Sequence, residues 1–131
     1  MITQRLNPEG LHKPIACYSQ VVRRGNLVAA SGMASIDEAG NVVGANDMTA
    51  QTTQTIGNLK AALAGVGAGL EDVIKVTIYL SDFSGYAEMD AAYRAFFGDF
   101  PPARATVRAD LVYPTLLVEI EAWAVVSETP A

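Results

Sequence analysis

The stretch VIKVTIYL, residues 73–80, decides the fold class of this chain. It is rich in β-branched residues, and its alternation predicts a half-buried strand with one face formed by Ile74, Val76, Ile78 and Leu80. The sequence on both sides of this strand has helical spacing instead. A strand between two helices favours an α/β (α+β) domain in which the helices cover a sheet.

The two helices have clear apolar stripes. Residues 48–66 place apolar side chains at helical spacing, and Asn46 or Asp47 precedes them as a candidate N-cap. Residues 86–97 carry an apolar and aromatic stripe, with Ser84 as the candidate cap. Aromatic residues at this spacing cover a sheet far more often than they bind a cofactor, so we interpret both stripes as core.

Four further strands complete the expected sheet. Two precede the first helix, joined by a turn at Arg24-Gly25-Asn26, and two follow the second helix; their ranges are 18–24, 27–31, 104–111 and 116–126. We therefore predict a single two-layer domain over residues 1–131, with a mixed, mostly antiparallel sheet and both helices on one face. Residues 1–16 are expected to form an extended N-terminal segment.

Charge limits the possible partners. The chain has 9 basic and 14 acidic residues and a net charge of −5, with no basic cluster longer than Arg23 and Arg24. Such a surface repels a phosphate backbone, so we expect no nucleic-acid partner. The sequence has no apolar run of membrane-spanning length and no signal peptide in its first residues. We therefore expect no membrane partner and a cytoplasmic location.

The single cysteine and the single histidine limit the chemistry. Cys17 and His12 exclude an intramolecular disulfide and a Cys/His zinc site, so we expect no metal. A Ser-His-Asp triad could use only His12. This histidine lies within residues 7–14, where we expect a mobile terminal segment.

The last two expected strands carry unusual polar faces. Alternation puts Arg104, Thr106 and Arg108 on one face of the first strand, and Glu119 and Glu121 on one face of the second. If the two strands pair antiparallel, the arginines and glutamates share the surface that the helices leave free. That surface would then be a candidate subunit interface.

Two interpretations of that surface remain open. The simpler one is a solvated sheet face with cross-strand ion pairs. However, Leu117 and Trp123 share the face of the glutamates, which favours a covered surface. A covered glutamate can be tuned toward general acid/base work, and a neighbouring arginine suits a substrate carboxylate.

Four segments together resemble the Rid (YjgF) family of enamine/imine deaminases. They are Tyr18-Ser19-Gln20, Ser31-Gly32, Pro102-Ala103-Arg104-Ala105 and Val118-Glu119-Ile120-Glu121-Ala122. Their order and spacing match the family from about residue 7 to residue 126.

The resemblance implies a fold like that of the small trimeric chorismate mutases. Three sheets would form an inner barrel with the helices outside, and the active sites would lie in clefts between adjacent subunits of a homotrimer. It also implies a hydrolase of the 2-iminobutanoate/2-iminopropanoate deaminase type. Such enzymes convert 2-aminoacrylate or 2-aminocrotonate, as their imine tautomers, to 2-keto acids and ammonia without a cofactor.

The resemblance also assigns roles to individual residues. Arg104 would anchor the substrate carboxylate, and Glu119 would hold or activate the attacking water. Tyr18 and Ser31 would line the pocket, together with Gly32. Three residues also have a purely structural interpretation: Tyr18 as a packing residue, Ser31 as part of the turn at Gly32, and Glu121 as a salt-bridge partner at the interface.

At two positions the sequence departs from the family pattern. Many deaminating members have a cysteine where this chain has Thr106, and an asparagine where it has Ser84; both remain candidate substrate-binding residues. The change at Ser84 leaves open a larger enamine substrate, such as an aminomuconate.

The alternative from another functional class is a trimer that binds small carboxylates without turnover. A ribonuclease role fits the acidic charge poorly.

Overall fold

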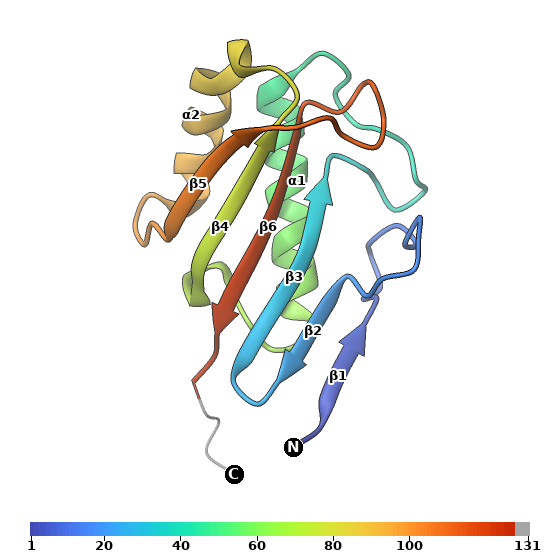
Figure 1. Ribbon diagram of the computed structural model, residues 1–131, viewed down its shortest axis with the longest axis vertical. Helices are drawn as coiled ribbons and strands as arrows, with labels where there is room; N and C mark the ends of the chain where they lie inside the picture. The colour runs from blue at the N-terminus through green and yellow to red at the C-terminus, as the bar shows by residue number, and fades with distance from the viewer. Residues whose placement is uncertain (128–131) are drawn as a thin grey trace.

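The strand expected at residues 73–80 is present as β4, Val73–Leu80, in the computed structural model, which describes residues 1–127. It belongs to a six-stranded sheet with the order β1-β2-β3-β6-β4-β5 (Figure 1). The other strands are β1 (Thr3–Leu6), β2 (Val21–Arg24), β3 (Leu27–Ala34), β5 (Ala103–Arg108) and β6 (Val118–Val125). All neighbours are antiparallel except β4 and β5.

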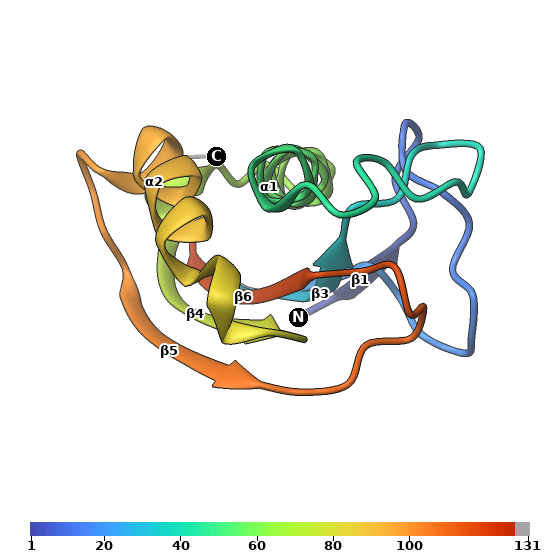
Figure 2. The same ribbon diagram turned by 90° about the horizontal axis from the view of Figure 1, so that it is seen from above.

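Both helices, α1 (Met48–Ala64) and α2 (Tyr86–Phe97), lie on one face of this sheet (Figure 2). This confirms the predicted fold class. Asp47 caps α1 as expected, because its side chain accepts a hydrogen bond from the backbone of Ala50. The cap predicted for α2 is wrong. Ser84 lies in a short 3₁₀ helix, Phe83–Gly85, that precedes α2.

The core lies between the sheet and the helices. Its largest fully buried side chains include Ile56, Leu59 and Leu63 of α1, Met89 and Phe97 of α2, and Ile78, Leu80 and Ile120 of the strands. The prediction for Ile74 is wrong, because a bulge between Val73 and Lys75 shifts the register of β4 against β6 and leaves Ile74 53% exposed. Val73 occupies the inner face in its place.

Helix α1 also buries polar side chains, and these fix the loops above it. The Asn58 amide donates to the carbonyls of Ala34 and Ile36 at 2.9 and 2.8 Å. The Gln51 amide donates to Thr115 O at 2.8 Å and accepts from the backbone of Leu117 at 2.8 Å. These bonds hold the ends of β3 and the start of β6 in fixed positions.

The N-terminal segment is packed against the domain, contrary to our expectation of a mobile one. β1 adds a strand to the edge of the sheet, which the sequence reasoning did not predict. Leu11 and His12 are 8% and 9% exposed. The side-chain amide of Gln20 donates to the carbonyl of His12 at 2.8 Å, which ties the segment to the start of β2.

The expected pairing of the last two strands is wrong. β5 pairs in parallel with β4 at the sheet edge, and β6 lies between β3 and β4. Helix α2 connects β4 to β5, and a helical crossover of this kind returns the chain in the parallel direction. In the observed register Val76 pairs with Arg104, while Tyr79 pairs with Glu119. Arg104 therefore points to the helix side of the sheet and Glu119 to the open side.

Candidate functional site

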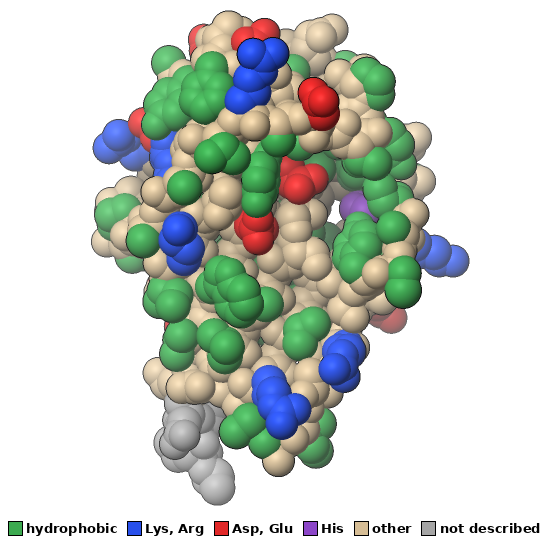
Figure 3. All heavy atoms as spheres, viewed as in Figure 1, with side chains coloured by type: hydrophobic (Ala, Val, Ile, Leu, Met, Phe, Trp, Pro, Cys, Tyr) green, Lys and Arg blue, Asp and Glu red, His purple; other side chains and the backbone are tan. Residues whose placement is uncertain are grey.

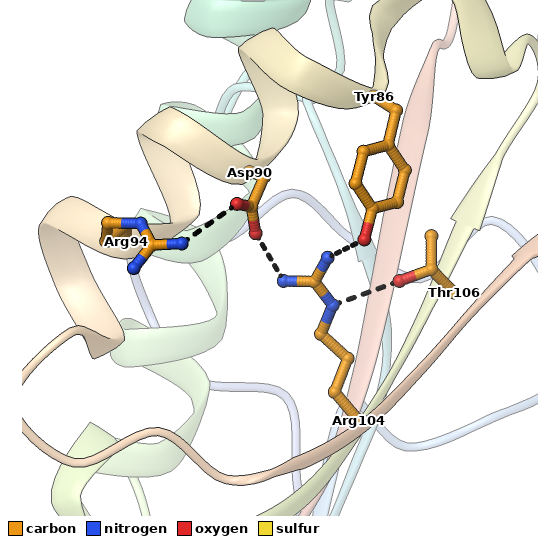
Figure 4. A network of polar contacts seen from close by, with 5 residues as sticks. All are labelled: Tyr86, Asp90, Arg94, Arg104 and Thr106. Atoms are coloured by element: carbon orange, nitrogen blue, oxygen red, sulfur yellow. Dashed lines mark hydrogen bonds and ion pairs between the residues drawn. The ribbon is translucent and has the colours of Figure 1, made fainter.

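Arg104 lies at the centre of a polar network between β5 and α2 (Figure 4). Its Nη1 donates to the Asp90 carboxylate at 2.7 Å, its Nη2 donates to the Tyr86 hydroxyl at 2.7 Å, and its Nε donates to the Thr106 hydroxyl at 3.0 Å. Asp90 also receives a bond from Arg94 at 3.2 Å. Each nitrogen of the Arg104 guanidinium therefore has one protein partner.

The surroundings of Arg104 are partly buried. Its side chain is 18% exposed, and its guanidinium carbon lies 4.8 Å from the centre of the Tyr93 ring. Burial raises the pKa of Tyr93 to about 12. The hydrogen bond from Arg104 is the main cause that holds the pKa of Asp90 below its usual value. A cavity of about 140 Å³ beside Arg104 is lined by Asp90, Tyr93, Phe97 and Pro101, among others.

Glu119 lies on the open face of the sheet, near the start of β6. It pairs with Ala34 of β3, next to a bulge between Ala30 and Met33. The bulge contains Gly32, and a Cβ atom there would lie only 2.8 Å from Cδ of Glu119. The absence of a side chain at Gly32 therefore leaves the space that the Glu119 carboxylate fills.

The same bulge is tied to the segment before β2. The Ser31 hydroxyl donates to the carbonyl of Ser19 at 2.6 Å, and its backbone N–H donates to Gln20 O at 3.0 Å. Tyr18 directly precedes this segment and is 38% exposed. The predicted residues Ser31, Gly32 and Glu119 thus lie together, with Tyr18 in the adjoining segment.

Two further groups on the open face affect Glu119. Burial is the main cause that raises the pKa of Glu119, and the charge of Glu121 raises it further. The Tyr79 hydroxyl donates a hydrogen bond to Glu121, which is also the main cause that raises the pKa of Tyr79. Glu119 is therefore easier to protonate than an ordinary glutamate, while Tyr79 keeps its proton.

The structure divides the predicted site into two groups of residues. The arginine group consists of Arg104, Thr106, Tyr86, Asp90 and Tyr93. The glutamate group consists of Glu119, Glu121, Tyr79, Ser31 and Gly32. Our expectation that arginines and glutamates share one face is wrong for a single chain, because the register puts the two groups on opposite faces. Ala105 and Val107 of β5 lie instead on the open side, where Val107 is 40% exposed.

Ser84 belongs to neither group. It lines an open hollow of about 550 Å³ with Asp82 and Glu88, and its backbone N–H donates to Asp82 at 2.8 Å. Sequence reasoning assigned Tyr86 to the core and missed Asp90. Both lie with Arg94 on one side of α2, at the spacing of four residues that brings helix side chains together, and this spacing was the available signal.

The arrangement suits acid/base chemistry on a small carboxylate. An arginine fork binds a carboxylate, and a glutamate that is easily protonated can take up and release a proton. Within residues 1–127, no cluster of three or more His, Cys, Asp or Glu side chains could hold a metal ion. The helices described over the same residues include none that is long and apolar enough to span a membrane.

The fold and these two groups define a small α+β protein with a divided arginine and glutamate site. A family model described as Endoribonuclease L-PSP matches residues 10–126. The chain is 40% identical over 116 residues to a RutC family protein of Pyrococcus horikoshii, which covers 88% of this chain and 92% of the relative. It is 35% identical over 113 residues to the 3-aminoacrylate deaminase RutC of Acinetobacter baylyi, covering 86% and 90% of the two chains.

A solved structure has the same fold. E. coli TdcF with bound serine superposes with a TM-score of 0.86 at 26% identity, covering 95% of this chain and 99% of that one. The chain therefore belongs to the YjgF/RidA/RutC family, as its sequence motifs predicted. This family includes enamine and imine deaminases.

Proposed function

We propose that this protein hydrolyses small reactive 2-imino acids, the tautomers of 2-aminoacrylate and 2-aminocrotonate, to 2-keto acids and ammonia. The observation that carries the proposal is the pair of half-sites. A guanidinium with a fixed orientation lies on one face of the sheet, and an easily protonated carboxyl lies on the other. The similarity to a 3-aminoacrylate deaminase supports chemistry on this class of substrate.

In this proposal Arg104 binds the substrate carboxylate. A guanidinium has five N–H groups, of which three donate to Asp90, Tyr86 and Thr106. One N–H remains on each terminal nitrogen, and these two can donate to the ligand. Because the three protein contacts fix the plane of the group, little side-chain entropy is lost when the ligand binds. A bound serine in the related TdcF structure is a ligand with such a carboxylate.

Glu119 then moves the protons of the reaction. It takes a proton from water while the water oxygen bonds to C2 of the protonated imine, and the C=N π pair moves to nitrogen. The protonated Glu119 returns this proton to the amino group of the resulting carbinolamine. The C–N bond breaks and ammonia leaves with the electron pair, while the hydroxyl gives its proton to the Glu119 carboxylate as the carbonyl forms. Glu119 then passes this proton to the ammonia, which leaves as ammonium. One carboxyl therefore acts as base and then as acid.

The two groups would meet between subunits of a homotrimer that resembles the chorismate mutase barrel. The open face of the sheet supports such an assembly, because it carries apolar side chains around its acidic ones (Figure 3). Leu27, Trp123 and Val125 on this face are 45%, 44% and 38% exposed. Large exposed apolar side chains that gather on one sheet face are typical of a subunit interface.

Substrate size follows from the same geometry. The cavity beside Arg104 is about 140 Å³ and is bounded by Phe97 and Pro101. On the Arg104 side this volume has room for an imine of three or four carbons, whereas a larger enamine such as an aminomuconate would need further space from the neighbouring subunit. The matching family model is described as an endoribonuclease. The net charge of −5 and the single histidine, His12, which is 9% exposed in the N-terminal segment, support that activity poorly.

A coupled assay tests the proposal. Serine or threonine and a pyridoxal-phosphate dehydratase generate the imine, and semicarbazide traps what remains. We expect the wild-type protein to suppress semicarbazone formation, and Arg104→Ala and Glu119→Gln to be inactive. If the wild-type protein matches buffer, hydrolysis of small imines is refuted.

Mixing the two inactive variants tests where the site lies. If Arg104 and Glu119 come from different subunits, an equal mixture regains about one quarter of the wild-type sites. Each site needs an intact Arg104 from one subunit and an intact Glu119 from its neighbour, and half of the subunits carry each intact residue. A site within one chain would regain none. Each variant by itself, at the same total concentration, is the matched control. Light scattering checks that every sample is trimeric.

A further inference from the structure

The pair formed by Tyr79 and Glu121 is not explained by substrate binding or by the fold. Both side chains lie on the open face, and the Tyr79 hydroxyl donates to a carboxylate oxygen of Glu121. In the register of the sheet, however, Tyr79 lies directly opposite Glu119, while Glu121 lies opposite Thr77. Tyr79 thus reaches diagonally past Glu119 to the second carboxylate.

We propose that Glu121, held by the Tyr79 hydroxyl, is a positioning residue that makes Glu119 the carboxyl that carries the proton during catalysis. This inference rests on the proposed function, because it deepens the role of Glu119. Two carboxylates at positions i and i+2 of one strand are about 7 Å apart along the backbone. At that separation the two negative charges repel each other, so the pair takes up its first proton more readily than a single carboxylate would. This proton binds to the carboxylate that has fewer hydrogen-bond donors around it.

The hydrogen bond decides between the two carboxyls. Glu121 accepts a hydrogen bond from a phenol that keeps its own proton, so this carboxylate already has a donor within the sheet. Glu119 has no such partner among the hydrogen bonds of residues 1–127, and it is partly buried against Gly32. The first proton therefore goes to Glu119, which agrees with the direction in which burial and Glu121 move its pKa.

Within residues 1–127, Glu121 is the one charged side chain that moves the pKa of Glu119. From β3, Gly32 and Ala34 lie beside Glu119, and neither is charged. From β4, the facing groups are Tyr79 and, further along the same face, Lys75, which pairs with Trp123. In the proposed trimer the Arg104 of a neighbouring subunit would also face Glu119. The variants compared below all keep Arg104, so its effect on Glu119 is the same in each of them.

The test follows the proton directly. Glu121→Gln removes the charge but keeps an oxygen acceptor for Tyr79, and Tyr79→Phe removes only the hydroxyl. Glu38→Gln, at an exposed position in a loop, is the matched control. The carboxyl ¹³C shifts of Glu119 and Glu121 in the full-length protein are titrated by NMR, and the pH dependence of kcat/KM is measured for the same variants.

In Glu121→Gln we expect Glu119 to titrate at a lower pH than in the wild-type protein, and the acid limb of kcat/KM to move in the same direction. In Tyr79→Phe we expect the Glu119 titration to move in the same direction, because Glu121 has lost the donor that distinguishes it from Glu119. Identical Glu119 titrations in the wild-type protein, Glu121→Gln and Tyr79→Phe would overturn the inference, even if the enzyme hydrolyses imines. Shifted titrations in a protein without hydrolase activity would instead refute the proposed function and leave the coupling intact.

Discussion

Replacing Gly32 by alanine tests the position of the Glu119 carboxylate without changing any charged residue. A Cβ atom at Gly32 would lie 2.8 Å from Cδ and 3.1 Å from Cγ of Glu119. Carbon atoms at their best separation are about 3.5–4.0 Å apart, so the carboxylate must move by roughly 0.7–1.2 Å. A displacement of about 1 Å at a catalytic group can cost on the order of 10²-fold in rate. We therefore expect kcat/KM of Gly32→Ala to fall by about two orders of magnitude.

The stability of this variant should change little. Gly32 does not have a positive φ angle, and the atoms that must move belong to the end of a flexible side chain. Gly57→Ala is the matched control, because Gly57 is exposed within α1 and a Cβ atom there meets nothing within 4 Å. It should stabilise the protein by about 1 kcal/mol and leave kcat/KM unchanged.

The coupled imine assay and thermal unfolding measure both quantities. A folded Gly32→Ala protein with activity within about twofold of the wild type would show that the carboxylate need not lie over Gly32.

Three further predictions follow from the contacts of individual side chains. Thr106→Val removes the acceptor of the Arg104 Nε–H and should raise KM by roughly 5- to 30-fold, with a smaller effect on kcat, as steady-state kinetics would reveal. Asn58→Ala leaves two buried carbonyls without a donor and should lower the free energy of unfolding by about 2–4 kcal/mol in urea titrations. The pKa of Asp90 is depressed in the folded state, so its contact with Arg104 stabilises the fold above the usual range of an aspartate and loses this effect as the pH falls through the folded-state value. The difference in stability between wild type and Asp90→Asn should therefore be largest near neutral pH and disappear in acid; a difference that is constant with pH would contradict this assignment.

The elements of the fold could be predicted from the sequence because their signals are local. Alternation located β4 at its observed bounds, and helical spacing located α1 with Asp47 as its cap. Apart from the cap of α2, the errors concern contacts between distant parts of the chain. Whether β5 pairs with β6 or with β4 depends on the path of α2. The residues of β5 and β6 alone do not indicate which strand is the partner. The bulge that turned Ile74 outward likewise depends on the partner strand β6.

The candidate site had the same limit. The alternation of β5 correctly separated Arg104 and Thr106 from Val107, but it could not say which face was which. The composition suggested that the polar face is the open one. In the structure, however, the guanidinium lies on the helix side, where Asp90, Tyr86 and the ring of Tyr93 satisfy it. A buried charge requires such partners, and α2 supplied them from a stripe that periodicity had assigned to the core.

The separation of the two groups changes what activity requires. If both half-sites were on one face, a monomer could hold a complete site, and assembly would affect only stability. With Arg104 on the helix side and Glu119 on the open side, the strand β4 and the sheet itself lie between them. No rotation of side chains brings groups together through a sheet whose central residues, such as Val76 and Ile78, are fully buried. Catalysis by both residues on one substrate therefore requires a second chain, and the proposed deaminase activity should be lost at dilutions where the proposed oligomer dissociates, while each subunit keeps its fold.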